Sequence, residues 1–355
     1  MGPKNPPRLR ERLLRWYEGN RRDLPWRHSS DPYAIWVSEI MLQQTRVAAV
    51  EQRYRAFMAR FPTVAALARA GEQEVLALWS GLGYYRRARM LHQAARHVVE
   101  DHGGVLPQTA IELRKLPGIG IYTAAAIASI AHGEAVAVVD GNVERVLCRL
   151  AGWNASDAAG KSGLSKRVAD LAARLVDPGR PGDFNQAMME LGATVCLPRN
   201  PKCLLCPIAG ACVTRGEHKT IRGARIEVRD AAYALCLRNA ATRTPAVLLQ
   251  QRPASATVMP GLFELPALHE YDFPSEELAM AVRHAIMRVN YRVRIRRIAE
   301  PEVGALTPKG GRRRWVPVAD LPRIALTGLA RKVLTRANLM PGPTESHPVA
   351  GQASL

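Results

Sequence analysis

The chain has 355 residues, and its 50 Lys and Arg residues against 31 Asp and Glu residues give a formal net charge of +19. This length allows two domains of ordinary size, and the excess of positive charge indicates a polyanionic partner, with DNA or RNA favoured over a membrane surface. No apolar run reaches the roughly 18 residues of a membrane-spanning helix, and the first residues lack the apolar core of a secretory signal. The sequence therefore predicts a cytoplasmic protein without a membrane partner.

Residues 8 to about 195 are predicted to be helical, because apolar residues recur there every three or four positions. The periodicity is clearest in residues 48–57, 91–99 and 164–175. Short polar side chains that favour helix starts precede three of the expected helices, namely Asp31, Thr63 and Thr109. A mainly helical domain is therefore expected over residues 1–217.

The composition changes after residue 217. Residues 218–229 are basic and poor in large apolar side chains, which predicts a linker. Alternating and β-branched residues then predict strands at 232–237, 246–250 and 291–298, and a helix is expected at 275–287. We expect a smaller α+β domain over residues 230–340 and a disordered tail, rich in Pro, Gly and Ser, over residues 341–355.

Four of the six cysteines follow the spacing Cys196-x6-Cys203-x2-Cys206-x5-Cys212. Four thiolates in one short loop indicate metal ligation, and the compact spacing favours a [4Fe–4S] cluster, with a zinc knuckle as the alternative. Arg199 and Lys202 place two cations on this loop, which suits contact with phosphate. The remaining cysteines, Cys148 and Cys236, are expected to be buried apolar residues.

A glycine-rich turn, Leu116-Pro117-Gly118-Ile119-Gly120, precedes an apolar helix that begins near Tyr122. Gly118 and Gly120 free the backbone to turn sharply, so that amides at the helix start can bind an anion such as a DNA phosphate. An ordinary corner between two helices is the alternative.

Two carboxylates stand out. Asp140 follows the apolar, strand-like run Val138-Val139 and precedes a glycine, so it is either a helix cap or a functional group. Glu39 has apolar neighbours, which predicts a raised pKa and a proton held near neutral pH, although a satisfied, half-buried helix residue is the alternative. Such a pair suits cleavage of a glycosidic bond, with one group as the acid and the other stabilising the sugar cation.

The order of SEIMLQQT, LPGIG, VVDGN and the four-cysteine loop resembles the helix–hairpin–helix DNA glycosylase superfamily. The stretches DPYAIW from Asp31, WSGLGYY from Trp79 and FNQAMMELG from Phe184 are similar to adenine DNA glycosylases of the MutY type. The resemblance covers most of residues 8–215. It implies a helical glycosylase domain with a [4Fe–4S] loop, a Nudix-like second domain, duplex DNA with a mispaired adenine as partner, and a monomeric enzyme.

The resemblance also implies roles for individual residues. Glu39 would protonate adenine at N7, Asp140 would stabilise the sugar cation, and Asn142 would assist. Tyr122 stands where related lyases carry a Schiff-base lysine, which favours hydrolysis. The adenine pocket would be lined by Trp26, Arg27, Leu42 and Gln186. The residues that would wedge into the duplex are Gln43, Gln44 and Tyr84.

Five tyrosine and arginine residues near the wedge have a structural alternative to a role in DNA binding. Tyr84 could pack in the core, and Tyr85 is expected to do so. Arg86, Arg87 and Arg89 are either a solvated helix face or phosphate contacts.

The second domain departs from the family in two respects. The glutamate-rich metal box of Nudix hydrolases does not follow Pro266, so a second hydrolase activity is not expected. Where the family reads 8-oxoguanine with Phe-Ser-His, this chain has Ile286-Met287-Arg288. Arg288 could donate to guanine O6 or N7 instead.

The sequence thus predicts a monofunctional DNA N-glycosylase that hydrolyses adenine mispaired with 8-oxoguanine or guanine. Three alternatives remain: a thymine mismatch glycosylase of the same superfamily, a bifunctional glycosylase/lyase, and a non-catalytic iron–sulfur DNA-binding protein. Tyr122 argues against the lyase, the long second domain against the thymine enzyme, and retention of Glu39 and Asp140 against the binding protein.

Overall fold

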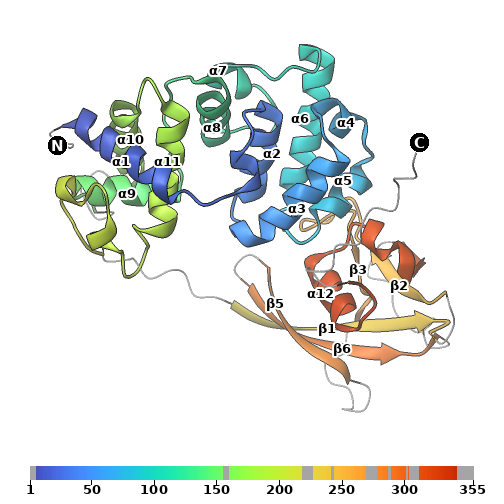
Figure 1. The fold of residues 1–355 in the computed structure, drawn as a ribbon. Coiled ribbons are helices and arrows are strands. Elements are labelled where there is room, and N and C mark those ends of the chain that lie inside the picture. The colour runs from blue at the N-terminus through green and yellow to red at the C-terminus, as the bar shows by residue number, and fades with distance from the viewer. Residues whose placement is uncertain are drawn as a thin grey trace. The chain divides into compact units, whose positions relative to one another are not determined.

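The computed structural model describes residues 5–154, 160–217, 227–240, 244–268, 278–286, 289–300, 303 and 312–341. The chain forms two compact units, Met1–Arg69 with Met90–Arg222 and Ala70–Arg89 with Gly223–Leu355. The first unit is helical and the second contains a mixed sheet, so the predicted fold class is confirmed (Figure 1). Most of the predicted linker and nearly all of the predicted tail lie outside the described residues.

Helices make up the first unit. They are α1 (Pro6–Asn20), η1 (Pro25–Arg27), α2 (Pro32–Leu42), α3 (Val47–Arg60), α4 (Val64–Arg69), α6 (Arg86–His102), α7 (Ala110–Leu113), α8 (Ile121–His132), α9 (Gly141–Ala151), α10 (Gly160–Leu175), α11 (Pro181–Thr194), η2 (Cys203–Leu205) and η3 (Ala209–Ala211). The first four residues of α6 belong to the second unit. The predicted helical character of residues 8–195 is confirmed.

Two packed groups of helices position the functional residues of the first unit. One core joins α1, α9, α10 and α11 through buried side chains such as Leu13, Leu147, Leu171 and Leu191. In the other group, α2 packs against α3 and α8, and α11 also contacts α8. The helix starts follow the predicted chemistry, since the Asp31 side chain accepts a hydrogen bond from the Tyr33 amide at 3.0 Å.

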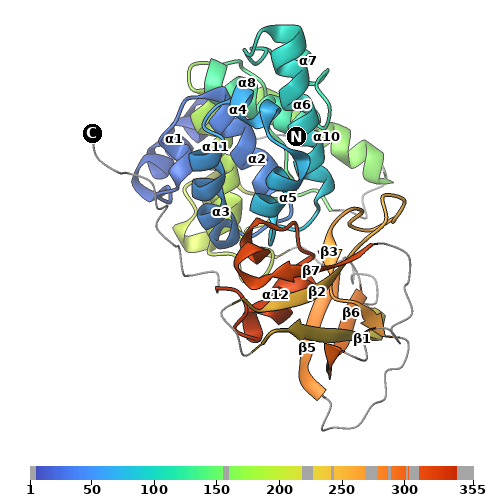
Figure 2. The same ribbon diagram turned by 90° about the vertical axis from the view of Figure 1, so that its right-hand side faces the viewer.

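The second unit contains a mixed sheet. Its elements are α5 (Glu72–Trp79), β1 (Glu227–Arg238), β2 (Ala246–Gln251), β3 (Phe263–Glu264), β4 (Ala267–Leu268), β5 (Leu278–Ile286), β6 (Val289–Ile298), β7 (Arg313–Pro317), η6 (Val318–Arg323) and α12 (Gly328–Arg336). The strand order is β3-β2-β1-β6-β5, with β4 paired to β1 and β7 paired to β2. β1 and β6 are parallel, and the other pairs are antiparallel. Helix α12 lies beside the sheet (Figure 2). Its apolar side chains share one core cluster with side chains of the strands.

The predicted helix at 275–287 is wrong, because residues 278–286 form strand β5. Leu, Ala and Met are good helix formers, but Val282 opposite Val293 of β6 buries both side chains in the core below the sheet. This tertiary contact overrides the local propensity. The helix that packs on the sheet is α12, where the Thr327 hydroxyl caps the first turn. The three predicted strands are confirmed as β1, β2 and β6.

No helix among the described residues has both the length and the apolar character that crossing a bilayer demands.

Candidate active site

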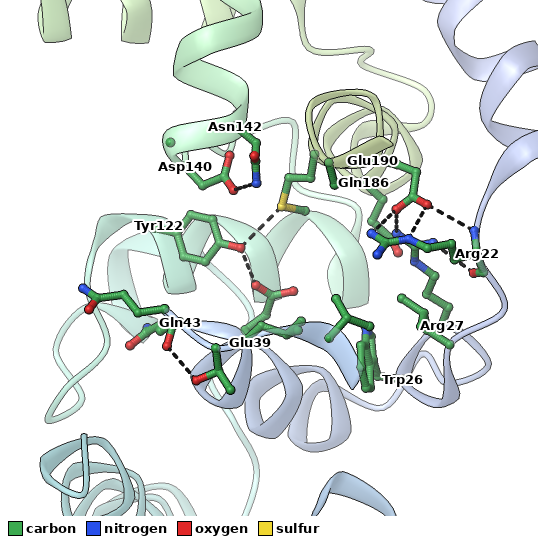
Figure 3. Close-up of a pocket in the computed structure, with 18 of the residues that line it drawn as sticks. Arg22, Trp26, Arg27, Glu39, Gln43, Tyr122, Asp140, Asn142, Gln186 and Glu190 are labelled. Carbon is green, nitrogen blue, oxygen red and sulfur yellow. Dashed lines mark hydrogen bonds and ion pairs between the residues drawn. The ribbon is translucent and has the colours of Figure 1, made fainter. Parts of the chain in front are cut away.

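A cleft with a volume of about 550 Å³ opens in the first unit (Figure 3). Its walls come from four segments that are far apart in the sequence: the stretch from η1 to the end of α2, the start of α8, the start of α9, and α11. The cleft brings together ten of the predicted site residues, namely Trp26, Arg27, Glu39, Leu42, Gln43, Gln44, Tyr122, Asp140, Asn142 and Gln186. A volume of this size suits a small ring system such as a nucleobase with part of its sugar.

Glu39 lies on α2 at the floor of the cleft and is only 6% exposed. Burial raises its pKa to about 7, the hydrogen bond from Tyr122 opposes that rise, and the negative charge of Asp140 adds to it. A carboxyl group with this pKa holds a proton near neutral pH and can deliver it to a bound base. The predicted raised pKa of Glu39 is confirmed.

Tyr122 occupies the first turn of α8 and points across the cleft to Glu39 (Figure 3). Its hydroxyl donates to Glu39 Oε2 at 2.6 Å and also lies 3.3 Å from the Met189 sulfur. Burial and the neighbouring Glu39 raise the pKa of Tyr122 well above its usual value. The hydroxyl therefore stays protonated and acts as a fixed donor that orients the Glu39 carboxyl group.

Asp140 is the N-cap of α9 and also lines the cleft, so the predicted helix cap is confirmed and the carboxylate lies where the proposed catalytic role requires it. Its Oδ1 accepts from the Val143 amide at 2.7 Å, and its Oδ2 accepts from Asn142 Nδ2 at 3.0 Å. The hydrogen bonds from the Val143 amide and the Asn142 side chain hold the Asp140 carboxylate in one orientation. The expected strand before Asp140 does not form; instead, the buried Asn185 side chain accepts a hydrogen bond from the Val138 amide and so fixes this extended segment.

Arg145 connects Asn142 with the cysteine loop. Its Nη2 donates to Asn142 Oδ1 at 2.8 Å and to the Gly192 carbonyl at 2.7 Å, while its Nε donates to the Cys196 carbonyl at 2.8 Å. Asn142 accepts from Arg145 and donates to Asp140, so the orientation of its amide is determined by partners on both sides. The backbone at Cys196 is thereby joined to Asp140 in the cleft by a chain of hydrogen bonds through Arg145 and Asn142.

The wall opposite Glu39 contains a charged network on α11 (Figure 3). The Glu190 side chain has no exposed surface and pairs with Arg22 and Arg27, each at 2.7 Å. Burial opposes ionisation of Glu190, but the two arginines outweigh it and hold its pKa at about 2. On the same helix, Gln186 accepts a hydrogen bond from Tyr17 at 3.2 Å. This wall therefore carries polar groups whose positions are fixed by hydrogen bonds and ion pairs.

Gln43 and Gln44 follow the end of α2 at the edge of the cleft. Gln43 donates to the Thr123 hydroxyl at 3.1 Å, whereas Gln44 is exposed and has a left-handed backbone with a φ of 54°. A left-handed backbone at a non-glycine residue carries strain, which often marks a functional position. Tyr84 lies in the second unit, is 49% exposed and has a φ of 45°.

The glycine-rich turn lies between α7 and α8. Gly118 has a φ of 76°, and a Cβ atom on it would come within 2.6 Å of the Met90 side chain, so the position requires glycine. Gly120 is the N-cap of α8. The first amides of α8 have no capping side chain and are available to an anion.

The four clustered cysteines line one small cavity beside Arg149. All are free, and Arg149 donates to the Cys196 sulfur at 3.3 Å and to the Leu197 carbonyl at 2.7 Å. Arg199 and Lys202 are exposed on this loop. Among the described residues, no three His, Cys, Asp or Glu side chains are arranged to hold a single metal ion. The other two cysteines, Cys148 and Cys236, are buried as expected.

Sequence reasoning missed Arg22, Met189 and Glu190. Glu190 follows Gln186 by four positions, and that helical spacing placed it on the same face as a residue already expected in the pocket. No spacing or motif in the sequence indicated Met189, and nothing distinguished Arg22 from the other arginines of the chain. The expectation that Tyr85 is a core residue is confirmed, since it is only 3% exposed.

The comparisons with known proteins agree with this geometry. The family described as HhH-GPD superfamily base excision DNA repair protein matches residues 37–171. The chain is 52% identical to human adenine DNA glycosylase over 216 residues, 58% of this chain and 39% of that protein. It is 46% identical to the mouse adenine DNA glycosylase over 71% of this chain and 52% of that protein. It is also 46% identical to the Mycolicibacterium smegmatis adenine DNA glycosylase, covering 56% of this chain and 66% of that protein.

Two solved structures of DNA repair proteins are also similar to this chain. A thermostable thymine-DNA glycosylase is 33% identical, with a TM-score of 0.53, over 58% of this chain and 94% of that one. An endonuclease III–DNA covalent intermediate has a TM-score of 0.50 at 21% identity, over 58% of this chain and 93% of that one, and shows the shared fold. The chain belongs to the HhH-GPD superfamily of base excision DNA repair proteins, and its sequence groups with the adenine DNA glycosylases. It spans 39% to 52% of the length of the human and mouse relatives.

Proposed function

We propose that this protein is a monofunctional DNA N-glycosylase that hydrolyses adenine from mispairs with 8-oxoguanine or guanine. The observation that carries the proposal is the convergence of a protonated Glu39 and the fixed Asp140 on one cleft of base-sized volume. The adenine DNA glycosylases among the relatives support the same substrate.

The base must leave the helix before these groups can reach it, because its reactive atoms are hidden in the stack. Amides at the start of α8, beside Gly118 and Gly120, would hold a backbone phosphate, as would Arg199 and Lys202. Gln43, Gln44 and Tyr84 would fill the gap in the duplex. The extruded adenine would enter between Trp26, Arg27, Leu42 and Gln186.

In the chemical step, Glu39 would transfer its proton to adenine N7 and so turn the base into a neutral leaving group. Breaking the N-glycosidic bond leaves a positive charge on the sugar, which the Asp140 carboxylate would stabilise, with Asn142 holding that carboxylate in place. Water would then add to the sugar carbon and give up a proton to the Glu39 carboxylate, which restores the acid. Tyr122 offers a hydroxyl and no amine, so the sugar would not be captured as a Schiff base.

The proposal is tested with a panel of duplexes that carry adenine opposite 8-oxoguanine, guanine, cytosine or thymine. We expect base release from the first two duplexes, and strand breakage only after alkali treatment. Strand breakage without alkali would indicate a lyase, and release of no base from any duplex would contradict the proposal. Equal rates opposite 8-oxoguanine and guanine would show that the Ile286-Met287-Arg288 segment does not read the lesion; Met287 and Arg288 lie outside the described residues.

A thymine mismatch glycosylase is the second candidate, because a thymine-DNA glycosylase of known structure is 33% identical over 58% of the chain. The adenine DNA glycosylase of mouse is 46% identical over 71% of the chain and so matches more of it. We therefore assign residues 1–217 to catalysis and residues 230–340 to reading the mispair. A duplex with thymine opposite guanine distinguishes the candidates, since we expect no thymine release from it.

We also propose that Cys196, Cys203, Cys206 and Cys212 hold a [4Fe–4S] cluster. They are four free thiols around one cavity, and Arg149 donates a hydrogen bond to the Cys196 sulfur at 3.3 Å. When bound, the cluster would cross-link the loop that carries Arg199 and Lys202. It would thereby fix the Cys196 backbone to which Arg145 is bonded.

Iron and sulfide analysis of the purified protein tests this assignment. We expect about four irons per chain, with Cys206→Ala losing most of them and Cys148→Ala retaining them. Cys148 is the control because it is a cysteine of the first unit that lies outside the four-cysteine loop. One zinc per chain in place of iron would contradict the proposal.

A further inference from the structure

The turn that carries Tyr84, residues 80–85, belongs to the same compact unit as the sheet, although it falls within the part of the sequence that matches the family. It joins α5 to α6, and three of its residues, Gly81, Gly83 and Tyr84, have left-handed backbones. Tyr84 is half exposed, whereas Ser80 and Tyr85 at the two ends of the turn are buried. The ends of the turn are therefore anchored, and the Tyr84 side chain reaches solvent.

Both anchors are bonded to one backbone carbonyl, that of Leu326 just before α12. The Tyr85 hydroxyl donates to it at 2.6 Å, and the Ser80 hydroxyl donates to it at 3.2 Å. Arg331 of α12 then donates to Ser80 Oγ at 2.8 Å. These bonds join positions more than 240 residues apart, and hydrogen bonds shielded from water in this way are costly to break.

The Leu326 carbonyl is itself held in place. The neighbouring Ala325 carbonyl accepts from the Phe263 amide at 2.8 Å, and the Thr327 amide donates to the Phe263 carbonyl at 2.8 Å. These two bonds attach the strand-like segment before α12 to β3 of the sheet. Any movement of the sheet and α12 is therefore passed directly to the ends of the turn.

The turn is also stiff internally. The Trp79 indole nitrogen donates to the Gly83 carbonyl at 3.1 Å, and Arg87 donates to the Leu82 carbonyl at 3.1 Å. The Arg87 guanidinium lies over the Tyr84 ring at 5.5 Å from its centre. Arg87 is thus a structural part of the turn and not the solvated residue considered from the sequence. Arg89, which follows the turn in α6, also donates a hydrogen bond to the Pro260 carbonyl at 2.6 Å.

We propose that Ser80 and Tyr85 are positioning residues that latch the Tyr84 turn to the C-terminal domain through the Leu326 carbonyl. The inference rests on the proposed function, in which Tyr84 enters the duplex and the C-terminal domain reads the opposite base. The latch makes these two elements one rigid body, so that contact between the domain and a mispair sets where Tyr84 enters the helix.

Hydrogen exchange tests the latch whether or not the protein is a glycosylase. Tyr85→Phe removes only the hydroxyl, and we expect amides of residues 81–87 to exchange at least about tenfold faster in the full-length protein. Tyr33→Phe is the matched control, because the Tyr33 hydroxyl makes the same kind of buried bond to the Phe61 carbonyl in the first unit. Exchange in residues 81–87 that is unchanged by Tyr85→Phe, or equally increased by Tyr33→Phe, would overturn the proposal.

A double-mutant cycle on adenine release then separates positioning from simple loss of stability. We expect Tyr85→Phe to slow single-turnover release from the 8-oxoguanine mispair about tenfold, but less than about twofold in a Tyr84→Ala background. Equal slowing in both backgrounds, or none in either, would overturn the positioning role. If the parent protein releases no base from any duplex, the proposed function fails and the exchange result alone decides whether the latch exists.

Discussion

Glu39 and Glu190 lie buried on two walls of the same cleft, Glu39 on α2 and Glu190 on α11. The pKa of Glu39 is raised to about 7, whereas that of Glu190 is lowered to about 2. Burial pushes both values upward, so burial cannot explain the difference. The partners do: Glu190 receives hydrogen bonds from two guanidinium groups, whereas Glu39 receives one from a neutral phenol.

The comparison shows how one cleft can contain a protonated glutamate, Glu39, and an ionised glutamate, Glu190. Arg27 pairs with Glu190, so the cation nearest to Glu39 is already bonded elsewhere. Glu39 is thereby left without a direct ion pair and keeps its proton. Under the proposed function, the two arginines would offer fixed donors to the base without neutralising the acid, because both pair with Glu190. The separate roles of Glu39 and Glu190 can each be tested by substitution.

The largest effect is expected from Glu39→Gln. This change removes the acid proton but keeps the size of the side chain, so adenine release should fall about 10³-fold, within the range typical of a lost general acid. Single-turnover kinetics measure the rate, and a gel-shift assay with the mispaired duplex measures binding. Binding should persist. A rate within tenfold of the parent would show that Glu39 is not the acid.

Glu190→Gln should mainly affect stability. It leaves two guanidinium groups facing a neutral side chain in a buried site, which typically costs about 3 kcal/mol. Urea unfolding measures this loss. Because the folded pKa of Glu190 is depressed, the ion pair stabilises the fold above the ordinary glutamate pKa of about 4.5, and this contribution disappears as the pH falls toward 2.

Asp183→Asn is the control for Glu190→Gln. It also removes an ion pair on α11, with Arg180, but this pair is exposed and should contribute less than about 1 kcal/mol. Similar losses of unfolding free energy in the two variants would show that burial does not make the Glu190 ion pairs more important for stability than an exposed pair.

Tyr122→Phe should produce a smaller change, in the pH dependence of the reaction. Release should decline as the pH rises above about 7, where Glu39 loses its proton. The Tyr122 hydrogen bond lowers the Glu39 pKa, so its removal should move this decline to higher pH. The rate profile between pH 5 and 9 measures the shift, with Tyr33→Phe as control. A decline that moves to lower pH would contradict the assigned direction.

Much of the site could be predicted because local chemistry marks it. The four cysteines, the Gly118 turn and the carboxylate in Val139-Asp140-Gly141 each carry a signal in adjacent residues. The apolar neighbours of Glu39 also predicted the direction of its pKa shift. The meeting of Glu39 with Asp140 has no local signal, because it depends on how α2, α8 and α9 pack.

The rest of the site depends on contacts that sequence spacing does not encode. Nothing adjacent to Arg22 shows that it pairs with a residue 168 positions away. Asn185, which fixes the approach to Asp140, looks like any helix asparagine. In the second unit, residues 278–286 have helical propensity, but pairing with β6 makes them a strand. The latch between Tyr85 and Leu326 uses a backbone carbonyl, which no side-chain pattern reveals.

The central claim is that Glu39 is protonated near neutral pH while Glu190 is not. Infrared difference spectra of the carboxyl band, recorded from pH 4 to 9 for the parent protein and for Glu39→Gln, measure this directly. We expect one carboxyl group that loses its proton near pH 7 in the parent and is missing from the variant. Identical titrations in the two proteins above pH 6 would contradict the account, because Glu39 would then already be ionised before the pH at which it must act.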